Sequence, residues 1–76
     1  MSQPTYGERA VELAFNPSGD EDVQVIKCGY ALIIDKLNDM RNGPAISERA
    51  RLFSIAITQA QAAQMWAVKA ITWQDE

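Results

Sequence analysis

The stretch that decides the fold is LFSIAITQAQAAQMWAV, residues 52–68, which carries no charged side chain and neither glycine nor proline. Alanine recurs in it at spacings of four and three residues, which places the alanines on one narrow stripe of a helix. Larger apolar side chains occupy the other faces, so this helix must be buried on most sides. A chain of 76 residues is too small to surround it alone. The stretch therefore predicts a helical protein that works as an oligomer, with a close helix–helix contact along Ala56, Ala60, Ala63 and Ala67.

The composition is that of a globular protein, with 47% hydrophobic and 22% charged residues. Cys28 is the only cysteine and there is no histidine, which excludes an internal disulfide and the usual zinc sites. We expect Cys28 to be a reduced, buried small hydrophobe. The formal net charge of −3 argues against a protein that binds duplex nucleic acid, because such proteins normally present a basic face.

The sequence gives no indication of export or of a membrane. Residues 1–15 lack the basic region and the long apolar region of a secretory signal. Residues 52–68 are short for a bilayer core of about 30 Å, and three glutamines interrupt them. We therefore expect a cytoplasmic protein with no membrane partner.

We expect an all-α fold in a single domain that covers residues 1–76. The first helix should be short, from Tyr6 to about Phe15, because Pro17 and Gly19 disfavour its continuation.

Two longer helices should follow. A capping box from Ser18 to Glu21 begins the first of them, and Asn42-Gly43-Pro44 stops it. The other begins near Ser47, a plausible N-cap, and continues to about Trp73. Because their connection is short, the two long helices should pack antiparallel as a helical hairpin.

Residues suited to catalysis are scarce. Without histidine, neither a Cys/His nor a Ser/His/Asp arrangement can be assembled, and no glycine-rich phosphate loop is present. Asp35 and Asp39 lie one turn apart and could chelate Mg²⁺, although the neighbouring Lys36 favours a solvated face. We therefore expect neither enzymatic activity nor a cofactor or metal.

Two residues suit a ligand better than a core. Lys27 lies among mostly apolar neighbours, where a cation either reaches the surface or meets an anion at an interface. Tyr6 precedes the first helix beside Gly7, where a flat ring could stack on a base and a bare backbone could let a ligand approach.

The longest helices carry a family pattern. SIAITQAQAAQMWAVKAI, residues 54–71, resembles the last helix of the hairpin domain shared by phage anti-CBASS and anti-Thoeris sponge proteins. VQVIKCGYALIIDKL, residues 23–37, is similar to the preceding helix of that domain, and Tyr6-Gly7-Glu8 to its N-terminal motif. The resemblance covers nearly the whole chain, and T-x-x-Q followed by M-W-A-V-[KR]-A is its most specific part.

The resemblance implies a compact hexamer that sequesters cyclic oligonucleotide signals of bacterial defence without cleaving them, in the host cytoplasm during infection. In the family, cyclic dinucleotides bind between protomers, where a tyrosine stacks on a base and a lysine of the second helix meets a phosphate. Tyr6 and Lys27 match these positions. We add Gly7 and Arg9 as lesser contributors to the dinucleotide site.

The family's separate trinucleotide site is matched only in part. Thr58 and Gln61 agree with its A-R-T-x-x-Q motif, but Ile57 stands where the family has arginine. The resemblance therefore implies weak trinucleotide binding or none.

Two other functions stay open from the residues alone. One is a structural or regulatory helical oligomer that binds a protein partner through an apolar groove. The other is an accessory subunit or enzyme of nucleotide metabolism that uses Asp35 and Asp39 with Mg²⁺. The residues do not rank cyclic GMP–AMP against cyclic di-AMP, di-GMP or uridine-containing signals.

Overall fold

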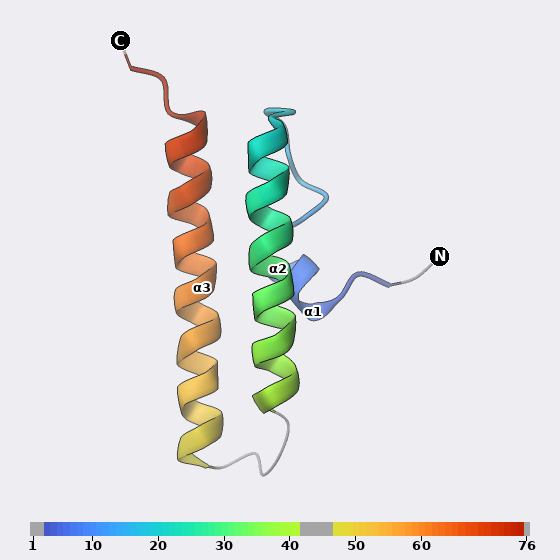
Figure 1. Ribbon diagram of the computed structural model, residues 1–76, viewed down its shortest axis with the longest axis vertical. Coiled ribbons are helices and arrows are strands. Elements are labelled where there is room, and N and C mark those ends of the chain that lie inside the picture. Colours follow the sequence, from blue (N-terminus) through green and yellow to red (C-terminus); the bar gives the residue numbers. More distant parts are fainter. Residues whose placement is uncertain (1–2, 42–46, 76) are drawn as a thin grey trace.

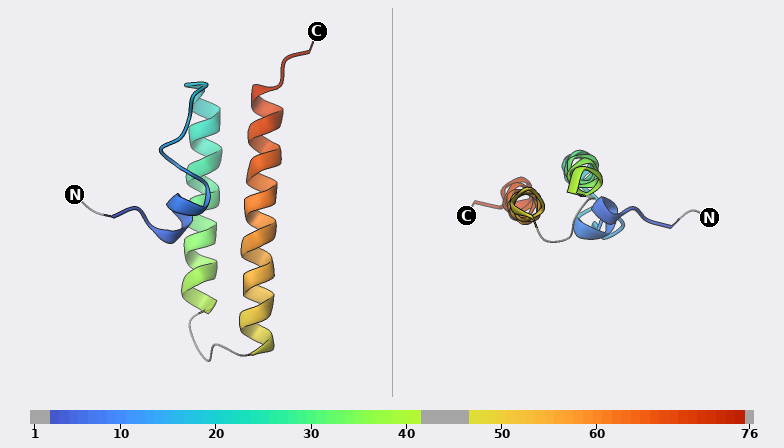
Figure 2. Two further views of the ribbon diagram at one scale, coloured as in Figure 1. Left: turned by 180° about the vertical axis from the view of Figure 1, so that it is seen from behind. Right: turned by 90° about the horizontal axis from the view of Figure 1, so that it is seen from below.

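The computed structural model describes residues 3–41 and 47–75, which form three α-helices and no strand (Figure 1). Helix α1 spans Tyr6–Ala10, α2 spans Glu21–Arg41 and α3 spans Glu48–Thr72. Helices α2 and α3 run antiparallel side by side, and α1 lies against α2 on one side of this pair (Figures 1 and 2). The predicted helical hairpin is therefore confirmed.

Helix α1 begins with a capping box that the sequence contains as T-x-x-E. Thr5 Oγ1 accepts a hydrogen bond from the Glu8 amide at 3.1 Å, and Glu8 Oε1 accepts one from the Thr5 amide at 2.8 Å. The helix ends at Ala10, and residues 11–14 form turns in which Glu12 has a left-handed backbone with φ of 52°. The prediction of a helix that continues to about Phe15 is wrong, because this left-handed residue reverses the chain.

Helix α2 begins with a different cap from the one predicted. Asp20 Oδ1 accepts from the Asp22 amide at 2.8 Å, while Ser18 Oγ accepts from the Asp20 amide at 3.1 Å. The predicted capping box from Ser18 to Glu21 is therefore wrong. Asp20 directly precedes the helix, and its side chain, in place of that of Ser18, accepts a hydrogen bond from a backbone amide of the first turn. The predicted stop at Asn42-Gly43-Pro44 lies outside the described residues.

Helix α3 begins as predicted. Ser47 is the N-cap, and its Oγ accepts from the Ala50 amide at 3.0 Å. Trp73 is the C-cap. None of the helices within residues 3–41 and 47–75 combines the length and apolar character needed to cross a membrane.

A small core holds the three helices together. Val11, Ala31, Ile34 and Ile57 form one buried cluster, so the turn after α1, the middle of α2 and the first half of α3 meet there. Gly7 brings α1 against α2 so closely that a Cβ atom on it would lie 2.0 Å from the Ala31 carbonyl oxygen. The absence of a side chain at Gly7 is therefore a packing requirement.

Much of the apolar surface lies outside this core. Ala60 packs against the core, whereas Ala63 is exposed, so only part of the alanine stripe enters the contact within one chain. Large exposed apolar side chains occur on both long helices: Val25, Leu32, Ile33, Met40, Leu52, Ile55, Met65 and Trp66. Within the described part of a single chain, these large apolar side chains and Ala63 thus stay exposed to solvent.

Cys28 is also exposed, so the prediction of a buried cysteine is wrong. Neighbouring residues of a helix point about 100° apart, and Lys27 takes the inward direction here.

Candidate functional site

Lys27 is buried, with 5% of its surface exposed. Its Nζ donates to the backbone carbonyl of Glu12 at 3.1 Å and to that of Phe15. It therefore ties the turn after α1 to α2, instead of reaching the surface or meeting an anionic group within the chain. An ammonium group has three N–H donors. Two of them bind these carbonyls, and the third makes no hydrogen bond to the described residues.

The surroundings of Lys27 form a small pocket of about 280 Å³. The Phe15 ring, which is exposed, lies with its centroid 5.6 Å from Lys27 Nζ. The other walls come from the loop before α2 and from the end of α3, and include Pro17, Ser18, Val68 and Thr72. This pocket combines a cation, an aromatic face and hydroxyl groups.

Tyr6 lies in a different pocket. Tyr6 is 39% exposed and lines a hollow of about 260 Å³ together with Arg9, Ala10 and Gln61. Gln61 Nε2 donates to the Ala10 carbonyl at 3.2 Å, which joins α3 to the end of α1. The structure thus brings Tyr6 and Arg9 together, adds Gln61 to them, and leaves Lys27 in a separate pocket of the same chain.

Sequence reasoning missed Arg41, which no motif singles out. The Arg41 Cζ atom lies 5.5 Å from the centroid of the Tyr6 ring. Its guanidinium donates to Asn38 Oδ1 at 2.6 Å and to Ser54 Oγ at 3.1 Å. The contact between Arg41 and Tyr6 depends on how α1 docks on α2, so no local sequence motif predicts it.

Gly7 is buried and does not line the pocket around Tyr6. Its amide donates to Asp35 Oδ1 at 2.6 Å, which fixes α1 on α2. Asp35 is therefore occupied by a backbone donor. Among residues 3–41 and 47–75, no group of three or more His, Cys, Asp or Glu side chains could hold a metal ion.

The residues assigned to a trinucleotide site are not arranged around Ile57. That side chain is 2% exposed and belongs to the core. The Thr58 hydroxyl donates to the Ser54 carbonyl of its own helix at 3.1 Å. Thr58 and Gln61 do line one pocket of about 250 Å³, but position 57 faces away from it into the protein.

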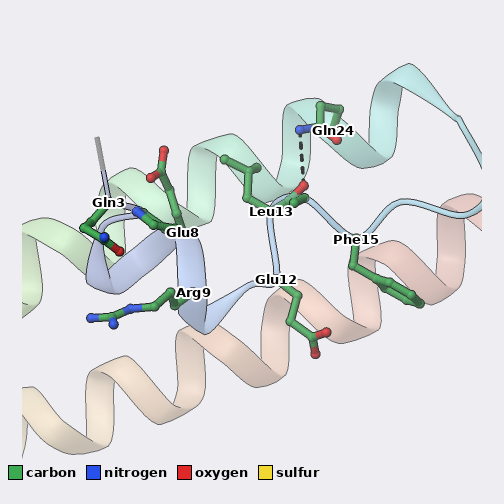
Figure 3. A pocket seen from close by; sticks show the side chains of 9 residues that line it. Gln3, Glu8, Arg9, Glu12, Leu13, Phe15 and Gln24 are labelled. Carbon is green, nitrogen blue, oxygen red and sulfur yellow. Dashed lines mark hydrogen bonds between the residues drawn. The ribbon is translucent and has the colours of Figure 1, made fainter. Parts of the chain in front are cut away.

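A wider pocket of about 670 Å³ lies beside α1 (Figure 3). Gln24 Nε2 closes one wall by donating to the Leu13 carbonyl at 3.4 Å. Glu8 and Glu12 line it, and Arg9 is the one cation among its lining residues. Two carboxylates against one guanidinium make this pocket a poor host for a phosphate.

A short helix docked on an antiparallel pair of long helices defines a helical-hairpin protein. The pockets described above present aromatic rings and cationic side chains to a ligand. The sequence profile of the Acb2/Tad1 hairpin domain matches residues 8–72, and the chain belongs to this family of anti-CBASS and anti-Thoeris sponge proteins. The match includes Arg9 and Lys27 and begins two residues after Tyr6. No curated protein and no solved structure matches the chain significantly. Membership suggests a role against host defence by binding.

Proposed function

We propose that this protein binds cyclic dinucleotides of bacterial anti-phage defence and sequesters them without cleaving them, which would antagonise CBASS-type immunity in the host cytoplasm. The observation that carries the proposal is the half-exposed Tyr6 ring, with Arg9 in the same pocket and Arg41 over the ring. An aromatic face suits a base, and the nearby cations suit its phosphates. Family membership supports the same function.

Lys27 enters this proposal as a phosphate ligand supplied by a second protomer. Within one chain Tyr6 and Lys27 line different pockets, and we infer that one ligand contacts both at a place where two chains meet. A ligand with two-fold symmetry on a two-fold interface makes each contact twice. Each charge-assisted hydrogen bond to a phosphate contributes about 1.5–3 kcal/mol, and each stacked base about 1–3 kcal/mol.

Homo-oligomerisation is part of the proposal, and the family favours a hexamer. Among residues 3–41 and 47–75 the buried core cluster contains four residues, while large apolar side chains such as Leu32, Met65 and Trp66 are more than half exposed. Burying them against other copies adds about 25 cal/mol for each Å² removed from water. The exposed Ala63 gives a second helix room to approach closely.

Calorimetric titration with a panel of cyclic dinucleotides, followed by chromatography of the recovered nucleotide, tests this function. Binding with intact nucleotide supports it. Loss of nucleotide that requires Mg²⁺ would replace it by an enzyme using Asp35 and Asp39. No binding to any member of the panel would favour the oligomer that binds a protein partner. Light scattering of the same samples measures the oligomeric state.

A further inference from the structure

Tyr6 stacks on a base at a lower entropy cost if its ring is already held in one orientation, and two sets of contacts hold its backbone. The capping box of Thr5 and Glu8 fixes the start of α1, and the Gly7 amide attaches that turn to Asp35 of α2. These contacts fix the backbone of Tyr6. They leave the side-chain torsions of Tyr6 undetermined, so a further contact must fix the ring.

Arg41 supplies this contact. Its guanidinium lies over the ring, and hydrogen bonds to Asn38 of α2 and Ser54 of α3 hold the guanidinium itself. An arginine at the end of a helix normally samples many rotamers, and two hydrogen bonds from a planar fork remove most of that freedom. The Tyr6 ring of α1, the Arg41 guanidinium of α2 and the Ser54 hydroxyl of α3 thus lie next to one another.

We propose that Arg41 is a positioning residue for ligand binding, which covers one face of the Tyr6 ring and leaves the opposite face for a nucleobase. A cation on one face draws electron density from the ring and favours stacking of an electron-rich purine on the other. Among the described residues Arg41 forms no ion pair with a carboxylate, so its charge also adds to the attraction of an anionic ligand. This inference rests on the proposed function and names a residue that acts through Tyr6.

The chain offers a matched control. Arg49 Cζ lies 4.8 Å from the ring of Phe53, so Arg49→Gln removes a guanidinium from an aromatic ring elsewhere in the same protein. Calorimetry should show that Arg41→Gln weakens cyclic dinucleotide binding by about five- to twentyfold, whereas Arg49→Gln changes it by less than about twofold. Equal affinities of the two variants would overturn the proposal.

A double-mutant cycle separates action through the ring from direct action on the ligand. If Arg41 positions Tyr6, then Arg41→Gln should weaken binding in the wild-type background and have little further effect in the Tyr6→Ala background. Full additivity of the two changes would overturn the positioning role. Ser54→Ala keeps the charge of Arg41 but releases one of its hydrogen bonds, and it should give a smaller loss of affinity even if Arg41→Gln fails to fold.

A readout without ligand keeps this inference distinct from the proposed function. The NMR signals of the Tyr6 ring protons should shift in Arg41→Gln and stay in place in Arg49→Gln. Unchanged Tyr6 signals in Arg41→Gln would refute the positioning of the ring. Wild-type protein that binds no cyclic dinucleotide would instead refute the function, and the ring signals would still decide whether Arg41 holds Tyr6.

Discussion

Replacing Lys27 with methionine tests whether a buried cation holds the turn after α1. Methionine keeps most of the aliphatic stem and removes the ammonium group, so the carbonyls of Glu12 and Phe15 lose their donor. Hydrogen bonds to charged groups contribute about 1.5–3 kcal/mol each, and partial rewetting of the turn returns part of that energy. We therefore expect Lys27→Met to lower the free energy of unfolding by about 2–4 kcal/mol.

Lys36→Met is the control, because Lys36 lies on the same helix and is exposed. It should change the free energy of unfolding by no more than about 0.5 kcal/mol. Denaturant unfolding followed by circular dichroism measures both variants, at one protomer concentration so that the proposed association contributes equally to both. If the two variants unfold at the same denaturant concentration, Lys27 does not stabilise the turn, and a role in ligand binding alone would explain it better.

Three further changes test the packing, the ligand site and the assembly. Gly7→Ala should destabilise the protein by about 1–3 kcal/mol or displace α1 from α2, since its Cβ would lie 2.0 Å from the Ala31 carbonyl oxygen; thermal unfolding measures this, and an unchanged melting temperature would contradict the close packing. Tyr6→Ala should weaken cyclic dinucleotide binding by about 1–3 kcal/mol through lost stacking while the oligomer survives, and calorimetry showing wild-type affinity would remove Tyr6 from the site. Ala63→Leu should disrupt assembly without unfolding the chain, because Ala63 is exposed in one protomer; light scattering that finds the wild-type mass would exclude Ala63 from the interface.

The hairpin could be predicted because its signals are local and strong. The apolar repeats of α2 and α3 extend over several turns, and Ser47 immediately precedes a run without helix breakers. The end of α1 could not be predicted in this way. Glu12 adopts a left-handed conformation that the fold stabilises through Lys27, which is fifteen residues further along the chain.

The residues of the candidate site stay predictions, and the sequence indicates the chemistry of each of them but not their arrangement. The chemistry of Tyr6 and Lys27 marked them as suited to a nucleotide, with Arg9 as a lesser contributor, and Tyr6 and Arg9 do line one pocket. Their separation from Lys27 within a chain, and the contact between Tyr6 and Arg41, depend on the docking of α1 against α2. Such contacts between distant segments leave no periodic signal in the sequence.

The burial of Ile57 bears on how this protein can evolve. The resemblance implies a trinucleotide site with arginine at this position, and Ile57→Arg would place a guanidinium beside Val11 and Ile34, where no counter-charge exists among the described core residues. An unpaired buried charge costs several kcal/mol, a large share of the stability of a small domain. Ile57→Arg alone is therefore destabilising, and a variant that carries it must first enlarge or reshape the core around position 57. Under the proposed function, a trinucleotide site built on position 57 would conflict with core packing, so its gain would be limited by folding stability.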